Sequence, residues 1–412
     1  MRAMKRWWMF WRLSITAVVL LCLNTAVAQV QYSITDLGTL GGANSIPIWI
    51  TNTGDVIGIS DTGQFDNFGN PIDHAFRWSK GVMQDLGTKG DVDSVGLGGN
   101  DLGAVVGNNY YNINHALLWY KGSVADLGTL VGPSGFSWAQ QINNAAQIVG
   151  GSLAADGTVH TALWTHGAIH DLGTFGVPNT NSFGQGINDL GQVVGGAQPT
   201  DVTNPILGFP PFHATLWNDG AIKDLGAGPE GSIGSVAFNI NNKSQVVGRF
   251  APPDPLEGAV AHAFLWESGV MHDLGVPAGL GDDNSEANSL NDNGQIVGDS
   301  GVGFIESYAP DHALLWQNGA WNDLNTLIPS NSGYYLIVAF DVNARGQIVV
   351  CAVNVSIGNI HAAMLSPQPL SINGSGSSAG LPHKLAPTLA ENARQMLMHA
   401  RAMKSGFDKT SH

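Results

Sequence analysis

A short motif that recurs along the chain constrains the fold more than any other feature of the sequence. In six copies a His is followed four residues later by a Trp and eleven residues later by Asp-Leu, and a seventh, incomplete copy lacks the Trp. Successive copies begin 41–53 residues apart, a period that is typical of solenoids and propellers. The histidines that begin the copies are His74, His115, His160, His213, His262, His312 and His361.

Each repeat carries the signals of two β-hairpins. A Gly stands three residues after each Trp, and Asn-Gly or Asp-Gly at this place supplies the positive φ of a tight primed turn. A second hairpin lies upstream of each His and is clearest at residues 187–195, Ile-Asn-Asp-Leu-Gly-Gln-Val-Val-Gly. Six of the seven repeats have a Ser six residues before the Asn position of that hairpin, and Ile337 is the exception. Each repeat therefore predicts four short strands.

These repeats predict an all-β fold, a seven-bladed β-propeller of four-stranded blades closed by its own N-terminal strand, in residues 29–366. The seventh repeat ends after its third strand at Leu365, and an unpaired strand at residues 32–37 stands near the N-terminus. Pairing the two closes a ring and covers two exposed strand edges. Small residues in the first strand of each repeat suit the crowded centre of such a ring. The alternative, a linear β-solenoid, usually has shorter rungs and leaves the unpaired strand unexplained.

Residues 1–28 have the pattern of a secretory signal peptide. Four basic residues precede a short apolar run at 13–23, and Ala26-Val27-Ala28 is a small-residue cleavage site. We therefore expect a secreted protein, periplasmic or extracellular, without a membrane span after cleavage. The alternative is a retained N-terminal anchor. Only Cys351 remains in the mature chain, which excludes an intrachain disulfide, so packing must hold the fold.

The chain after the repeats changes in composition. Residues 367–385 are rich in Ser, Gly and Pro and predict a linker. Residues 386–412 predict a short amphipathic helical tail with basic residues between its apolar positions. Those apolar positions are Leu389, Ala393, Met396, Leu397, Ala400 and Met403. We expect the tail to lie outside the ring and to be dispensable for its folding.

Negative charge limits the partners of the chain. After removal of the signal peptide, 13 Lys and Arg stand against 32 Asp and Glu, and the propeller region has 8 basic and 30 acidic residues. Such a surface repels phosphate backbones, so we expect no nucleic-acid partner. We expect a monomer that meets an extracellular glycan or protein.

The repeat also carries a family resemblance. Its three parts read Asp-Leu-Gly-Thr-Leu, then Ile-Asn-x-x-Gly-Gln-Val-Val-Gly, then His-Ala-Phe-Leu-Trp, and the last part is complete at residues 262–266. In this pattern, over about residues 32–366, the chain resembles the HAF family of bacterial extracellular repeat proteins. The resemblance implies an exported protein, and it supplies no catalytic residue.

The repeated polar residues favour structural roles over chemistry. Equivalent histidines on separate blades lie far apart, so they cannot converge on one metal ion, and each is expected to bond an Asp of a fourth strand or a backbone carbonyl. The Asp of each Asp-Leu pair is expected to cap backbone amides. The cluster of Asp282, Asp283 and Glu286 is a weak calcium candidate, with a solvated acidic loop as the alternative. We find no catalytic motif and expect no cofactor.

The connections between second and third strands vary in length, from 8 residues between Gly107 and His115 to 18 between Gly195 and His213. Repeat proteins place recognition on such a variable face, and exposed aromatic rings suit sugars or extended peptides. The candidate binding residues there are Phe65, Phe68, Tyr110, Tyr111, Phe209, Phe212, Phe304, Tyr308, Tyr334 and Tyr335. The alternative is that some of them fill gaps between blades.

The sequence therefore favours an exported, non-catalytic binding or scaffold propeller that holds a glycan or a peptide on its variable face. Two alternatives stay open. One is a secreted hydrolase or lyase built on the same frame, and the other is a structural matrix or adhesion protein whose tail helix docks a partner.

Overall fold

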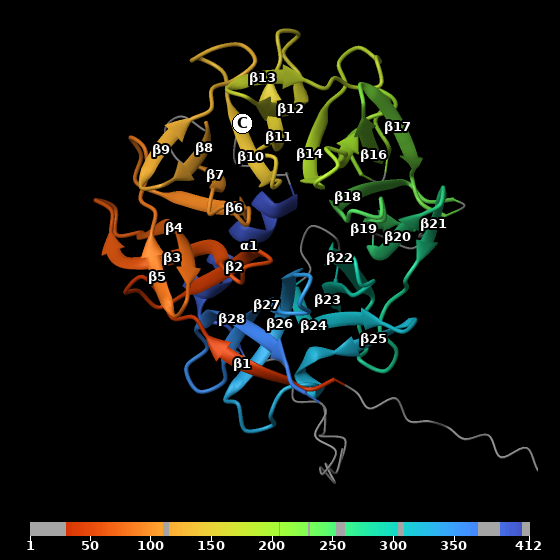
Figure 1. The fold of residues 1–412 in the computed structure, drawn as a ribbon. Coiled ribbons are helices and arrows are strands. Elements are labelled where there is room, and N and C mark those ends of the chain that lie inside the picture. The colour runs from red at the N-terminus through yellow and green to blue at the C-terminus, as the bar shows by residue number, and fades with distance from the viewer. Residues whose placement is uncertain are drawn as a thin grey trace, which may run out of the picture.

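The protein is a ring of seven four-stranded antiparallel sheets around a central channel (Figure 1). A computed structural model describes residues 30–109, 115–205, 207–229, 231–252, 260–303, 309–369 and 388–405. The predicted signal peptide lies outside these residues, as does most of the predicted linker. Each sheet is one blade, and the blades follow the chain around the ring. The predicted seven-bladed propeller is therefore confirmed.

Blades 1 to 6 use four consecutive strands each, beginning with β2, whereas blade 7 combines the last three strands with β1. The described strands are β1 (Tyr32–Asp36), β2 (Ser45–Ile50), β3 (Val56–Phe65), β4 (Pro71–Ser79), β5 (Val82–Asp85), β6 (Ser94–Gly99), β7 (Val105–Asn109), β8 (Ala116–Tyr120), β9 (Ser123–Asp126), β10 (Ser137–Ile142), β11 (Ile148–Leu153), β12 (Val159–Thr165), β13 (Ala168–Asp171), β14 (Ser182–Ile187), β15 (Val193–Ala197), β16 (His213–Asn218), β17 (Ala221–Gly226), β18 (Gly234–Ile240), β19 (Val246–Ala251), β20 (His262–Glu267), β21 (Val270–Asp273), β22 (Asn284–Leu290), β23 (Ile296–Val302), β24 (Ala309–Gln317), β25 (Ala320–Asp323), β26 (Tyr334–Val342), β27 (Ile348–Asn354) and β28 (Ile360–Pro367). The described helices are the 3₁₀ helix η1 (Leu324–Thr326) and α1 (Glu391–Ser405).

The N-terminal strand closes the ring, as the unpaired strand in the sequence predicts. β1 pairs antiparallel with β28 along its whole length. Asp36 at the end of β1 accepts hydrogen bonds from His361, whose Nδ1 lies 2.8 Å away, and from the hydroxyl of Tyr334. Burial raises the pKa of Asp36, but the hydrogen bonds outweigh burial and lower the pKa to about 2. This carboxylate therefore ties the first strand of the chain to the last blade.

The turns between third and fourth strands have the two-residue form that the Gly pattern predicts. In blade 6 Gln317 pairs with Ala320, and the intervening Asn318 and Gly319 have φ values of 57° and 80°. Positive φ at both central residues defines a type I′ turn, whose twist matches that of the flanking strands. Both central residues also have positive φ in the equivalent turns of blades 1 to 5, which are Lys80-Gly81, Lys121-Gly122, His166-Gly167, Asp219-Gly220 and Ser268-Gly269.

The repeated Ser joins neighbouring blades. The Oγ of Ser94, at the start of blade 2, accepts a hydrogen bond from the backbone N of Ala75 at 3.0 Å and donates one to the carbonyl of Gly87 at 2.8 Å. Ala75 and Gly87 belong to blade 1 and its exit, so one hydroxyl satisfies groups of two blades. The other serines that make both contacts are Ser45, Ser137, Ser182, Ser235 and Ser285.

At the junction between blades 6 and 7 a different side chain links the two blades. Ile337 replaces the Ser there, and Asn325 replaces the Gly that follows Asp-Leu in the other blades. The Oδ1 of Asn325 accepts a hydrogen bond from the backbone N of Leu336 at 2.8 Å, and its Nδ2 donates to the carbonyl of Leu336 at 2.9 Å. At this junction the bridging side chain therefore comes from the earlier blade, whereas at the other six junctions it comes from the later blade.

A belt of asparagine side chains links the blades around the channel. Each belt residue lies in the turn between the first and second strands, and its Nδ2 donates to the carbonyl of the equivalent residue in the next blade, at 3.0–3.2 Å. The donors are Asn100, Asn143, Asn188, Asn241, Asn291 and Asn343, and the last donates to Thr51. This belt gives a physical reason for the Asn that marks six of the seven repeats.

The helix α1 lies in the central channel and not outside the ring (Figure 1). The apolar positions predicted from the sequence are correct, since Ala393, Met396, Leu397, Ala400 and Met403 are all buried. They share one hydrophobic cluster with residues of blades 1, 2 and 7. The expectation of a tail separate from the ring therefore needs correction, because amphipathic periodicity shows that one helix face is covered without showing what covers it.

Among the described residues, none of the helices combines the length and the apolar character that crossing a bilayer requires.

Candidate ligand-binding site

The aromatic residues predicted to form a binding face do not form one platform within the described part of the chain. Phe65 and Phe68, in the hairpin that joins β3 to β4, are 64% and 90% exposed. Phe209 and Tyr334 are half-buried, and Tyr334 bonds Asp36. Four of the predicted residues lie outside the described ranges, namely Tyr110, Tyr111, Phe304 and Tyr308.

Phe212 and Tyr335 are core residues, which corrects their predicted exposure. Only 7% of Phe212 is accessible, and its ring packs edge-on against Phe183 with the centroids 5.0 Å apart. Tyr335 is 5% exposed, and its ring lies 6.2 Å from that of His312. Both residues lie at strand starts, where a large ring fills space beside the neighbouring strands.

Six of the seven repeated histidines pair with the Asp of the fourth strand of their own blade. In blade 1 the Nδ1 of His74 lies 2.9 Å from the carboxylate of Asp85, and its Nε2 lies 3.2 Å from the carbonyl of Val92. His312 differs, because it pairs with Asp282. The remaining pairs are His115–Asp126, His160–Asp171, His213–Asp224, His262–Asp273 and His361–Asp36.

The acidic residues considered for calcium do not converge. Asp282 Oδ2 lies 3.0 Å from Nδ1 of His312, and Asp283 accepts a hydrogen bond from a neighbouring amide side chain at 2.7 Å. The carboxylate of Glu286 lies in the channel, where Nη2 of Arg401 is 3.1 Å away. Within the described ranges, no three His, Cys, Asp or Glu residues form a group that could hold a metal ion.

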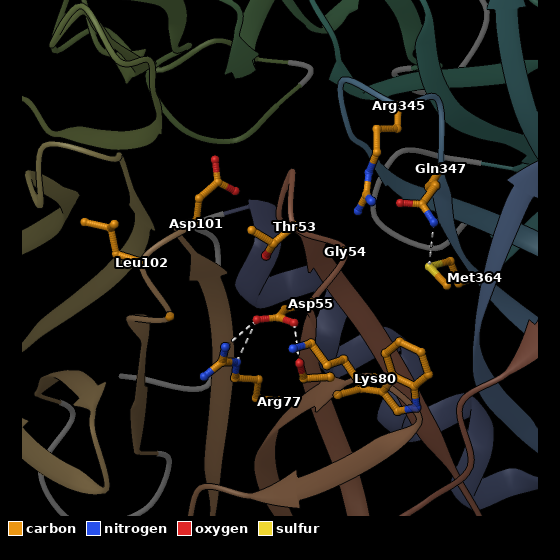
Figure 2. Close-up of a pocket in the computed structure, with 13 residues that line it drawn as sticks. Thr53, Gly54, Asp55, Arg77, Lys80, Asp101, Leu102, Arg345, Gln347 and Met364 are labelled. Atoms are coloured by element: carbon orange, nitrogen blue, oxygen red, sulfur yellow. Dashed lines mark hydrogen bonds and ion pairs between the residues drawn. The ribbon is translucent and has the colours of Figure 1, made fainter.

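A cavity of about 430 Å³ lies where blades 7, 1 and 2 meet (Figure 2). It opens on the turn face, by which we mean the face that carries the connections between first and second strands and between third and fourth strands. The lining residues come mostly from these turns: 53–55 and 77–80 in blade 1, 101–103 in blade 2, and Arg345, Gln347 and Met364 in blade 7. We call this cavity the basic pocket. It lies on the face opposite the one that the sequence predicted.

An ion pair shapes the wall of the basic pocket. The guanidinium of Arg77 donates to Asp55 Oδ2 through Nε at 3.0 Å and also through Nη2, and the hydroxyl of Ser79 donates to Asp55 Oδ1 at 2.6 Å. The side chain of Asp55 is only 12% exposed and that of Arg77 is 30% exposed. The charge of Asp55 is therefore already satisfied by three donors from its own blade.

Two other cations reach the basic pocket without such a partner. Lys80 and Arg345 are exposed, and neither side chain makes a hydrogen bond or an ion pair with another described residue. The guanidinium of Arg345 extends from blade 7 toward Gly54 (Figure 2), where a Cβ would lie 2.6 Å from its Nη2. Gly54 has a φ of 92°, so the turn favours Gly at this position.

The balance of charge in the basic pocket is unusual for this chain. Three of the eight Lys and Arg residues between 29 and 366 line it. Two carboxylates line it as well, but Asp55 is bound to Arg77, and Asp101 accepts hydrogen bonds from the backbone N and the side-chain amide of Asn52 at 2.8 and 3.4 Å. Asp101 keeps its negative charge, because amide donors do not neutralise it, but Lys80 and Arg345 outnumber it. The pocket therefore has a net positive charge and suits an anionic group.

Two departures from the repeat mark this pocket in the sequence. Three residues after the repeated His, blades 2 to 6 all have Leu, whereas blade 1 has Arg77. Four residues after the belt position, blades 3 to 7 all have Gln, whereas blade 1 has Asp55. These two departures face each other as the ion pair. Departures from an internal repeat, rather than the repeat itself, mark the place where one blade differs in role.

Comparison with solved structures finds similar folds at low sequence identity. The β-propeller domain of the Trilobed protease from Pyrococcus furiosus aligns with 82% of this chain and 99% of its own, at 7% identity and a TM-score of 0.46. The acylaminoacyl peptidase of Pyrococcus horikoshii aligns with 82% of this chain at 10% identity and a TM-score of 0.44, and this chain spans about half, 53%, of the peptidase. TolB from Acinetobacter baumannii aligns over 78% of this chain and 65% of its own at 9% identity, with a TM-score of 0.38. No family model and no curated protein matches the sequence.

Proposed function

We propose that this protein is an exported, non-catalytic binding propeller that holds the anionic group of an extracellular glycan or peptide in the basic pocket. The observation that carries the proposal is the pair of cations, Lys80 and Arg345, that reach one cavity from two blades and have no ion-pair partner in the described part of the chain. Charge-assisted hydrogen bonds from guanidinium and ammonium groups are among the strongest that a protein makes to carboxylate, sulfate or phosphate.

The chemistry of the lining supports binding over catalysis. The pocket is lined by neither His nor Cys, and the Asp55 carboxylate that accepts the hydrogen bond of the Ser79 hydroxyl is also bound by the guanidinium of Arg77. The ion pair of Arg77 and Asp55 instead gives the site a fixed wall. A preformed wall lowers the entropy lost when a ligand is bound.

The exposed pair Phe65 and Phe68 supports a second contact for the same ligand class on the opposite, loop face of blade 1. Aromatic rings at such exposure stack on sugar rings or on peptide side chains. Because this pair and the basic pocket lie on opposite faces, their contributions to binding can be separated by mutation.

A glycan and peptide array that contains matched acidic and neutral members tests the proposal. We expect acidic members to bind, and we expect Lys80→Ala with Arg345→Ala to weaken that binding at least tenfold, as loss of about 1.4 kcal/mol would. Lys121→Ala is the matched control, since Lys121 occupies the equivalent turn in blade 2 and does not line the pocket. Binding restricted to neutral members, or equal loss in the control, would refute an anion site at the basic pocket.

A further inference from the structure

The channel presents a complete binding surface for the apolar face of α1. Met396, Leu397 and Met403 pack in one cluster with Ile48 and Ile50 of β2 and with residues of blades 2 and 7. Ala393 and Ala400 are fully buried on the same helix face, where their small size brings the helix close to the strands. The opposite face, with Arg394 and Met398, remains exposed.

The cations of this helix meet carboxylates that the ring buries. Arg401 Nη1 donates to Asp299 at 2.7 Å and its Nη2 donates to Glu286 at 3.1 Å. The side chains of Asp299 and Glu286 are 0% and 7% exposed. Lys404 donates to the carbonyl of Phe340. Burial lowers the pKa of Lys404 to about 8, although nearby carboxylates, first Asp341, oppose this change.

The ring also supplies polar groups at both ends of the helix. Nε2 of Gln140 donates to the carbonyls of Met403 and Lys404 at 2.7 and 2.9 Å. The carbonyls of a last helical turn have no partner within the helix, so this contact satisfies groups that are otherwise left to water. Near the other end, the backbone N of Ala390 donates to the carbonyl of Gly358 at 3.2 Å.

The ring is closed by contacts that do not involve the helix. Its seven sheets, the pairing of β1 with β28 and the asparagine belt all lie within residues 32–367. The helix is joined to the ring by residues 368–390, and 23 residues can span at most about 75–80 Å when extended. The covalent link is thus long enough for the helix to leave the channel while the chain stays intact.

We propose that the central channel is a binding site for a basic amphipathic helix, and that the tail of this chain is its exchangeable occupant. Recognition combines an apolar stripe of small and flexible residues with two cations three residues apart, Arg401 and Lys404. The carboxylates of Glu286, Asp299 and Asp341 on the channel wall complement those cations. This proposal does not depend on the basic pocket, because none of the hydrogen bonds that Gln140, Arg401 and Lys404 make in the channel involves a residue that lines the pocket.

The test separates helix from ring after folding. In the full chain, residues 374–380 are replaced by the recognition sequence of a specific protease, and the purified protein is then cut. We expect the C-terminal fragment to co-elute with the ring. We expect a fluorescent peptide of residues 386–412 to exchange into the channel in proportion to its concentration, while the ring stays folded and monodisperse.

Two peptide variants make the test specific. Arg401→Gln in the peptide should weaken binding at least tenfold, because it removes the ion pair with the buried Asp299 and one of the two cations that pair with Glu286. Arg394→Gln is the matched control and should change binding less than twofold, because Arg394 lies on the exposed face. Aggregation of the cut ring on loss of the fragment would show that the helix is part of the folding core. Failure of the peptide to exchange, or equal effects of the two variants, would equally overturn the proposal.

Discussion

The central channel and the basic pocket both gather the scarce cations of this acidic chain, yet they use them in opposite ways. In the channel, Arg401 is 17% exposed and bridges Glu286 and Asp299, which are almost wholly buried. In the pocket, Lys80 and Arg345 are exposed and have no such partner among the described residues. The difference shows that position in the ring, and not residue type, decides whether a cation is engaged in a buried ion pair or remains available to a ligand.

Burial and pairing explain this difference. Removing one member of a buried ion pair leaves a charge that water cannot reach, so such a pair is costly to break. An exposed cation is hydrated by water, so removing it changes the free energy of unfolding little. Arg77 lies between these limits, since its partner Asp55 is largely buried while Arg77 itself borders the cavity. The loss of stability on mutation should therefore be largest in the channel, intermediate at the Arg77–Asp55 pair and smallest at the exposed cations of the pocket.

The largest loss of stability is expected for Glu286→Ala. This change leaves both Arg249 and Arg401 without the carboxylate that they share, and we expect the free energy of unfolding to fall by about 3–5 kcal/mol. The midpoint of urea unfolding measures the loss. Asp201→Ala, at an exposed residue, is the control, and an equal effect of both variants would remove the distinction between channel and surface charges.

A smaller loss is expected for Arg77→Ala. Asp55 keeps its hydrogen bond from Ser79 but loses its cation, so the free energy of unfolding should fall by about 1–2 kcal/mol. Urea unfolding again provides the measurement, here beside Lys80→Ala in the same blade. No difference between the two variants would mean that the ion pair does not stabilise the pocket wall.

Asp55→Asn should separate stability from binding. Losing the charge of Asp55 should cost about 1 kcal/mol of stability, because Asn still accepts a hydrogen bond from Arg77. The freed charge of Arg77 should at the same time strengthen the binding of an acidic array ligand by about threefold to tenfold. Titration calorimetry on parent and variant measures the binding. Weaker binding in the variant would show that Asp55 itself contacts the ligand.

The smallest effect on stability is expected for Lys80→Ala combined with Arg345→Ala. Neither side chain has a partner among the described residues that its removal would leave unsatisfied, so the free energy of unfolding should change by no more than about 0.5 kcal/mol. The same double variant should show the largest loss of anion binding. A loss of stability above about 2 kcal/mol would show that these two cations stabilise the fold, as those of the channel do.

The elements that could be predicted from the sequence are those set by local, repeated interactions. The type I′ turn at Asn318-Gly319 needs only positive φ, which the residue types themselves allow. The pairing of β1 with β28 follows from a count of strands, because a strand edge left open is unfavourable wherever the chain places it. The turn depends only on residues that are adjacent in sequence, and the strand pairing depends only on the number of strands in each repeat.

Contacts between distant segments could not be predicted in the same way. His312 fits the repeat as well as the other histidines, yet it pairs with Asp282. Asn325 performs the role of the missing Ser from the other side of a junction, and only the positions of both blades reveal this. The expected aromatic platform was in part wrong for the same reason, since Phe212 and Tyr335 pack against rings that are distant in sequence.

By itself the sequence determined the number of blades, the closure of the ring and the apolar face of the tail helix, because periodicity and strand edges are properties of the chain alone. Tertiary structure alone decided that this helix enters the channel, that Arg401 meets Glu286 and Asp299, and that Arg77, Lys80 and Arg345 line one pocket. Those residues come from blades and segments separated by up to hundreds of positions. Their approach depends on the curvature of the closed ring, which brings the first, second and seventh blades side by side.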